Sequence, residues 1–207
     1  METDKRPFIK KPHFFKPETK FKINESKIHY TDLLTYTALR SFLNSSTRDC
    51  YPSLETIAKR AGVCKSFVID SIYRLESAEY ISVWRSREIK VVNKYYFKDP
   101  VNFDRIPYEF FFYEDLTLNE KSILLALREL TDINLFHIEG SIKDIAATLC
   151  MSYKMLHKQL TSLIAKGYVR QLGKAKYSLE KVRWLFMDGK PREPVKKEQE
   201  RFMFFLS

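Results

Sequence analysis

The chain has 207 residues, of which 44% are hydrophobic and 14% aromatic, so it can bury a core and allows one large domain or two small ones. A formal net charge of +10 favours a polyanionic partner, nucleic acid before an anionic membrane surface. No apolar run approaches the ~18–20 residues of a membrane span, and the first residues lack the apolar core of a signal peptide. Three cysteines without a C-x-x-C pair argue against a disulfide framework and a cysteine-based zinc site, so we expect a cytoplasmic protein.

An N-terminal arm, residues 1–27, is basic and rich in Pro and Phe. Pro7, Pro12 and Pro17 recur every five residues and disfavour a helix. Such an arm could lie along a DNA backbone, dock on the protein through its Phe side chains, or remain disordered; the sequence leaves these three roles open.

An internal repeat organises the rest of the chain, because residues 31–81 match residues 119–169 at an ungapped offset of 88. The match keeps a tripeptide, an S-x-x-x-I-A pattern, four apolar positions and an aromatic–aliphatic pair. In the first copy these are Ala38-Leu39-Arg40, the segment from Ser53 to Ala58, Val63, Val68, Ile72 and Leu75, and Tyr80-Ile81. Two copies of one supersecondary unit are therefore predicted.

Each copy is predicted to begin with three helices. The first helices are expected to start at the N-caps Thr31 and Asn119, each followed by an acid, Asp32 or Glu120, that suits the helix dipole. The remaining landmarks are the N-caps Ser53 and Ser141, the turns at Gly62 and Cys150, and third helices over 64–78 and 152–166. Gly62 suits a left-handed turn, whereas Cys150 makes the second turn a weaker prediction.

Strand-like residues follow each third helix and predict a hairpin. In the first copy they are 80–84 and 89–97 around a turn at 85–88; in the second they are 168–172 and 175–179 around a turn at 173–174. Three helices and a hairpin, with a short turn between helices two and three, form a winged helix-turn-helix. We therefore expect a mainly α fold with small β-hairpin wings (α+β), built from two tandem winged-helix domains.

The segments Tyr51-Pro52-Ser53-Leu54-Glu55-Thr56-Ile57-Ala58 and Asn93-Lys94-Tyr95-Tyr96-Phe97 carry a family resemblance. Together with the apolar positions between them, they resemble the winged-helix modules of phage and plasmid replication proteins and bacterial regulators. The resemblance covers residues 28–98 and 116–186, and the tandem arrangement is similar in outline to plasmid initiators with two winged helices. It implies a DNA-binding fold and identifies no single biological role.

The expected organisation is an arm at 1–27, winged helix 1 at 28–98, a linker at 99–115, winged helix 2 at 116–188 and a tail at 189–207. The linker is acidic and holds an aromatic run at 108–113, so we expect it to pack between the domains. The tail ends in an apolar cluster at 202–206, which should be buried on its own chain, on a second copy or on another protein.

DNA-facing residues are predicted on the outer face of each third helix and in the wings, because the third helix of this motif enters the major groove. In the second copy they are Tyr153, Lys154, His157, Lys158 and Thr161 on the helix, and Arg170, Lys174 and Lys176 in the wing. In the first copy they are Lys65, Ser66 and Arg74 on the helix, and Arg85, Arg87 and Lys90 in the wing. Residues 153–183 carry eight basic residues against one acid, Glu180, so we expect the second copy to be the main DNA reader. The first copy could instead use its helix for a protein contact.

No catalytic motif is found, and neither a cofactor nor a metal is expected. The pattern of Asp70 with Glu88-Ile89-Lys90 echoes metal-dependent nucleases, but the predicted fold separates these residues, so we expect no enzyme. The predicted function is sequence-specific binding of double-stranded DNA, as a phage or plasmid replication initiator. The alternatives are a transcriptional regulator and then a protein-binding adaptor. A homodimer, or a replication or transcription protein bound by winged helix 1 or the tail, is a possible partner.

Overall fold

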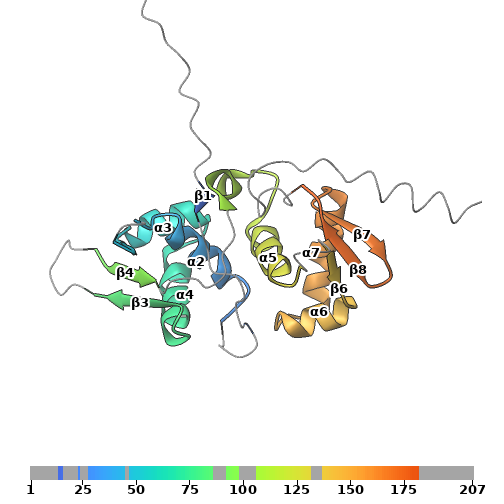
Figure 1. The fold of residues 1–207 in the computed structure, drawn as a ribbon, viewed down its shortest axis with the longest axis horizontal. Helices are drawn as coiled ribbons and strands as arrows, with labels where there is room; N and C mark the ends of the chain where they lie inside the picture. The colour runs from blue at the N-terminus through green and yellow to red at the C-terminus, as the bar shows by residue number, and fades with distance from the viewer. Residues whose placement is uncertain are drawn as a thin grey trace, which may run out of the picture.

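The computed structural model describes residues 14–15, 23, 28–44, 47–85, 92–97, 106–131 and 137–181. Within them the fold is α+β, as predicted, and two halves share one order of elements (Figure 1). The first half comprises α2 (Asp32–Arg40), β2 (Asp49–Cys50), α3 (Leu54–Ala61), α4 (Lys65–Ser77), β3 (Ile81–Trp84) and β4 (Lys94–Phe97). The second half comprises α5 (Leu118–Glu129), β6 (His137–Glu139), α6 (Ile142–Thr148), α7 (Tyr153–Ala165), β7 (Val169–Gly173) and β8 (Lys176–Leu179).

Each half contains an antiparallel three-stranded sheet, with strand orders β2-β4-β3 and β6-β8-β7. The hairpins β3–β4 and β7–β8 were expected, although the second one turns at residues 174–175, one residue later than predicted. The sequence did not indicate β2 or β6. These strands are two and three residues long, too short to show a period-two pattern. They pair with the hairpins through Asp49 opposite Tyr96 and through Ile138 opposite Tyr177.

The helix ends follow the sequence closely. Ser53 and Ser141 are N-caps whose hydroxyl groups accept a backbone hydrogen bond, as predicted. Thr31 is the N-cap of α2, whereas the prediction for Asn119 is wrong, because α5 begins earlier. Its N-cap is Thr117, whose side chain and that of Glu120 form a capping box.

The turns before α4 and α7 adopt matching backbone conformations. Gly62 has φ +71° and Cys150 has φ +50°, so both lie in the left-handed region, and the predicted turn is confirmed in both copies. A residue with a Cβ carries strain there, which explains why the sequence signal is weaker at Cys150.

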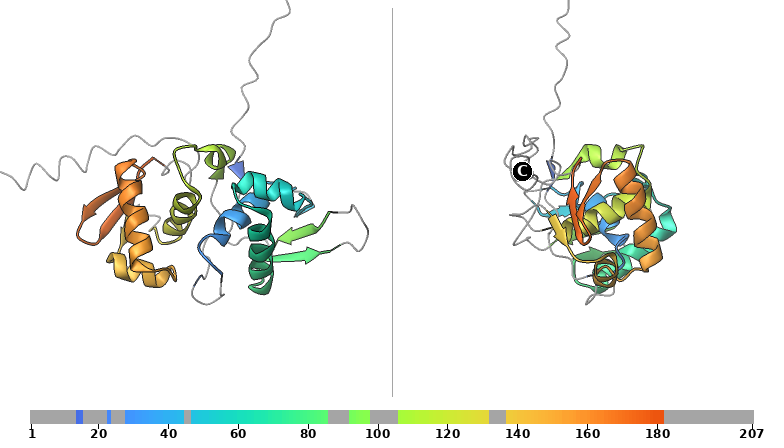
Figure 2. Two further views of the ribbon diagram at one scale, coloured as in Figure 1. Left: turned by 180° about the vertical axis from the view of Figure 1, so that it is seen from behind. Right: turned by 90° about the vertical axis from the view of Figure 1, so that its right-hand side faces the viewer.

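The two halves pack against each other through α2 and α5, which lie side by side at the centre of the molecule (Figures 1 and 2). Tyr30 donates a hydrogen bond to Asn119 Oδ1 across this contact at 3.3 Å. The hairpins β3–β4 and β7–β8 project at opposite ends of the long axis. Both halves contribute to one continuous hydrophobic core.

The segment that joins the halves is described from residue 106 onward. It forms β5 (Ile106–Pro107) and the 3-10 helix η1 (Tyr108–Phe112), whose Phe110 is fully buried. The short strand β1 (Phe14–Phe15) pairs antiparallel with β5, so part of the arm lies against this segment. The rest of the arm, other than residue 23, and residues 99–105 and 182–207 lie outside the described residues. None of the helices described here is long and apolar enough to cross a membrane.

Candidate nucleic-acid interface

Both halves contain a pair of helices joined by a tight turn, α3–α4 and α6–α7. The second helix of each pair buries one apolar stripe, made of Val68, Ile72 and Leu75 in α4 and of Leu156, Leu160 and Leu163 in α7. Because these stripes face the core, the opposite faces of α4 and α7 are left for solvent or a ligand. These are the faces that a helix-turn-helix places in the major groove.

The exposed face of α7 carries all five residues predicted on it. Tyr153, Lys154, His157, Lys158 and Thr161 are exposed. Tyr153 and His157 lie ring against ring, with centroids 5.7 Å apart, and the Thr161 hydroxyl donates to the His157 carbonyl at 2.9 Å. The helix contains two lysines and no acid, and within the described part of the chain neither lysine has an ion-pair partner. This face therefore presents two positive charges that no described acid neutralises.

The wing of the second half adds one more exposed cation. Lys174 lies exposed at the hairpin turn and has no ion-pair partner among the described residues. Arg170 is paired with Glu180 at 3.0 Å, and Lys176 lies 3.7 Å from Glu139. Of the three predicted wing residues, Lys174 is thus the one without an acidic partner in the described part of the chain.

The predicted cations of the first half that the structure describes are all paired with acids. Lys65 forms an ion pair with Glu55, and Arg85 forms one with Glu76 at 2.5 Å. The Arg85 guanidinium also lies 5.1 Å from the Tyr73 ring centre. Helix α4 holds two basic and two acidic residues, so its net charge is zero. Ser66 is exposed, and its hydroxyl lies 3.2 Å from the Cys64 sulfur. Arg87 and Lys90 lie outside the described residues.

Arg74 is engaged inside the first half. Its guanidinium donates two hydrogen bonds to the fully buried Asp32 carboxylate, at 2.7 and 2.8 Å, and its own side chain is 27% exposed. This bidentate pair ties the last turn of α4 to the start of α2. Asp32, an acid 42 residues away in the sequence, therefore occupies the guanidinium that was predicted to contact DNA.

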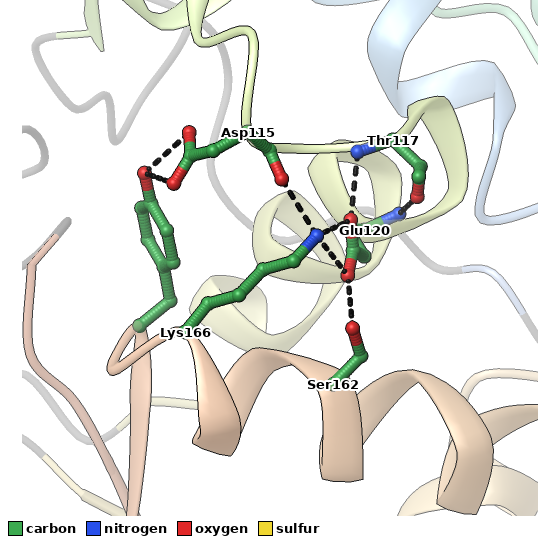
Figure 3. Close-up of polar contacts among 6 residues, drawn as sticks. Asp115, Thr117, Glu120, Ser162 and Lys166 are labelled. Atoms are coloured by element: carbon green, nitrogen blue, oxygen red, sulfur yellow. Dashed lines mark hydrogen bonds and ion pairs between the residues drawn. The ribbon is translucent and has the colours of Figure 1, made fainter.

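A corresponding network holds α7 to α5 (Figure 3). The Glu120 carboxylate, equivalent to Asp32 in the repeat, accepts hydrogen bonds from Ser162 at 2.6 Å and from Lys166 at 2.8 Å. Lys166 also donates to the Asp115 carbonyl, and the Asp115 carboxylate accepts from the Tyr168 hydroxyl. Burial of Glu120 opposes its ionisation, but the hydrogen bonds from Lys166, Ser162 and Thr117 outweigh it and lower its pKa to about 2.

These two buried acids were interpreted from the sequence only as charges that suit helix dipoles. In the structure each one fixes the C-terminal end of a candidate recognition helix. The repeat places the two acids at equivalent positions, since Asp32 and Glu120 are 88 residues apart. An acid beside an apolar helix stripe needs a partner when buried, so this equivalence indicates a structural role for both.

Comparison with known proteins finds a similarity in the first half. Residues 28–81 match the family described as helix-turn-helix domain. The match spans the part of the chain from α2 to the start of β3 and includes the α3–turn–α4 pair. No curated protein and no solved structure matches. A helix-turn-helix domain is a DNA-binding unit, so the match supports DNA as a partner.

The structure does not test the pattern that echoed metal-dependent nucleases, because Glu88, Ile89 and Lys90 lie outside the described residues. Asp70 is exposed on α4. Among the residues with described positions, no group of three His, Cys, Asp or Glu side chains is placed to hold a metal ion.

Proposed function

We propose that this protein binds double-stranded DNA sequence-specifically through two winged-helix modules, and that it acts as a binding protein and not as an enzyme. The helix-turn-helix match supports this for the first half. For the second half the support is the repeated order of elements, with α6, its left-handed turn, α7 and the hairpin β7–β8 in the same succession.

The observation that carries the proposal is the pair of exposed lysines on α7. Phosphate binding gains its free energy from the release of counterions by unpaired cations, and a lysine already held by a carboxylate must first lose that partner. Lys154 and Lys158 have no such partner among the described residues, while Lys65 and Arg85 do. The second half is therefore the principal DNA reader.

Replacement of lysines by alanine tests whether the second half contributes more to DNA binding than the first. Lys154→Ala with Lys158→Ala should weaken DNA binding by about 10-fold or more, and should lower the slope of log K against log salt by about 1.8. The matched first-half variant, Lys59→Ala with Lys65→Ala, removes the same charge from exposed lysines and should change both quantities less. Fluorescence anisotropy over a salt series measures both. Equal losses in the two variants would contradict the ranking.

The biological role is proposed to be initiation of phage or plasmid replication, supported by the tandem layout that resembles two-winged-helix initiators. Selection of bound fragments from the source genome tests it. Clustered repeats beside a replication gene would support the initiator. Scattered promoter sites would instead identify a transcriptional regulator, and failure to enrich any fragment would exclude both and favour a protein-binding adaptor.

A further inference from the structure

The guanidinium of Arg60, in α3, lies inside a cage of four aromatic rings. Its central carbon is 4.6 Å from the Phe42 ring centre, 5.5 Å from Tyr108, 5.8 Å from Phe111 and 6.0 Å from Phe112. Phe42 follows α2, and the other three rings belong to η1. Arginine over several ring faces is a directional contact, because the cation is attracted to the negative face of each ring.

Hydrogen bonds connect the residues of this cage to Ser41 and to α5. Arg60 donates to the Ser41 hydroxyl at 3.4 Å, and the Tyr108 hydroxyl donates to the Ser41 carbonyl at 2.8 Å. On the far side of η1, the Phe111 carbonyl accepts a hydrogen bond from Lys121 of α5 at 2.7 Å. A continuous set of contacts thus runs from the helix-turn-helix of the first half to the first helix of the second.

The internal repeat indicates that the three-helix unit does not need an arginine at this position. Its counterpart at the offset of 88 is Thr148, which is exposed and bonds only to the carbonyl of Asp144 in its own helix among the described residues. Since α6 folds without an arginine there, the arginine of α3 serves the junction that the second half lacks.

We propose that Arg60 is a positioning residue that locks the two halves at one separation and orientation, so that the two recognition helices read a two-part DNA site of one allowed spacing. This inference rests on the proposed function. A rigid joint makes binding of the second half effectively intramolecular only when the DNA presents both half-sites at the matching distance and helical phase. A loose joint would accept several spacings.

The rigidity of the joint between the two halves can be tested first without DNA, with spin labels on two natural cysteines. Cys64 precedes α4 and Cys150 precedes α7, and both are exposed, while Cys50 is buried. Pulsed electron–electron double resonance on the full chain should give one narrow distribution of distances between the two labels for wild type. Arg60→Ala and Tyr108→Phe should broaden it, whereas Lys59→Ala, which removes an exposed charge from the same helix, should not. A broad wild-type distribution, or an unchanged one in Arg60→Ala, would overturn the proposal.

Selection from a random DNA library then tests the consequence. Wild type should enrich two motifs at one spacing, and a 5 bp insertion, about half a helical turn, should weaken binding by about 100-fold. In Arg60→Ala this discrimination should fall at least 10-fold, while affinity for a DNA with a single half-site and the unfolding midpoint of the full chain stay unchanged. Tyr108→Phe, which removes only a hydroxyl, covers the case in which Arg60→Ala unfolds. The same single spacing in both variants would overturn the proposal. If no motif is enriched by wild type, the proposed DNA-binding function fails, and the distance distributions still decide the joint.

Discussion

Replacing Glu120 by glutamine tests whether the buried acid holds α7 in place. The Glu120 side chain is 2% exposed and its two oxygens accept from Lys166, Ser162 and the Thr117 backbone amide. Glutamine has nearly the same shape, so the helix core is preserved. It removes the charge and leaves the ammonium of Lys166 without its carboxylate partner.

The magnitude follows from the pKa of Glu120, which is lowered from 4.5 to about 2 in the folded chain. Such a difference between the folded and unfolded states corresponds to as much as about 3 kcal/mol of stability at neutral pH. Because the folded-state pKa is the lower one, this stability is fully present above pH ~4.5 and is lost as the pH falls toward 2. About 2 kcal/mol of it should disappear between pH 7 and pH 3.

Urea unfolding at a series of pH values measures the effect. At pH 7 the Glu120→Gln variant should be less stable than wild type by up to about 3 kcal/mol, and the difference should shrink by about 2 kcal/mol at pH 3. Glu109→Gln, which removes an exposed carboxylate from η1, should show no such pH-dependent difference. A Glu120→Gln difference that stays constant with pH would refute the assignment of this stability to the ionised carboxylate.

Two further predictions concern the first half. Arg74→Ala should lower the free energy of unfolding by about 2–3 kcal/mol, because it strands the fully buried Asp32 carboxylate, whereas Lys65→Ala, whose ion pair is exposed, should leave the urea midpoint unchanged. Cys64 should react with a disulfide reagent near neutral pH long before Cys50. A hydrogen bond with Ser66 lowers the pKa of the exposed Cys64 thiol, while burial raises the pKa of Cys50 to about 12. Equal rates in the native protein would mean that the core around Cys50 is open.

The helices and hairpins were predictable from the sequence because their signals are local. Ser53 and Ser141 cap helices through atoms three residues away, and the apolar stripes recur at helical spacing. The N-cap prediction at Asn119 is wrong although asparagine is a good N-cap. The capping box formed by Thr117 and Glu120 satisfies two backbone donors, so the helix begins two residues earlier. Strands β2 and β6 escaped prediction because strands this short are defined by their partners and not by their own pattern.

The charges at the candidate interface were harder to interpret, because ion pairing depends on the tertiary fold. In the sequence Arg74 and Lys158 look alike, each being a basic residue on the outer face of a third helix. Only the fold brings Asp32 against Arg74, and only the fold leaves Lys158 without a described partner.

The two halves therefore differ in a way that a family match does not capture. The match to the helix-turn-helix family covers residues 28–81 of the first half, from α2 to the start of β3. Positive charge without an acidic partner among the described residues is found on α7 of the second half, at exposed surface positions. A shared scaffold places a helix where DNA can be read, whereas the unpaired cations on its outer face determine how strongly phosphate is bound. Since the α7 lysines can vary without disturbing the buried stripe of Leu156, Leu160 and Leu163, affinity can be changed in the second half while both halves keep one fold.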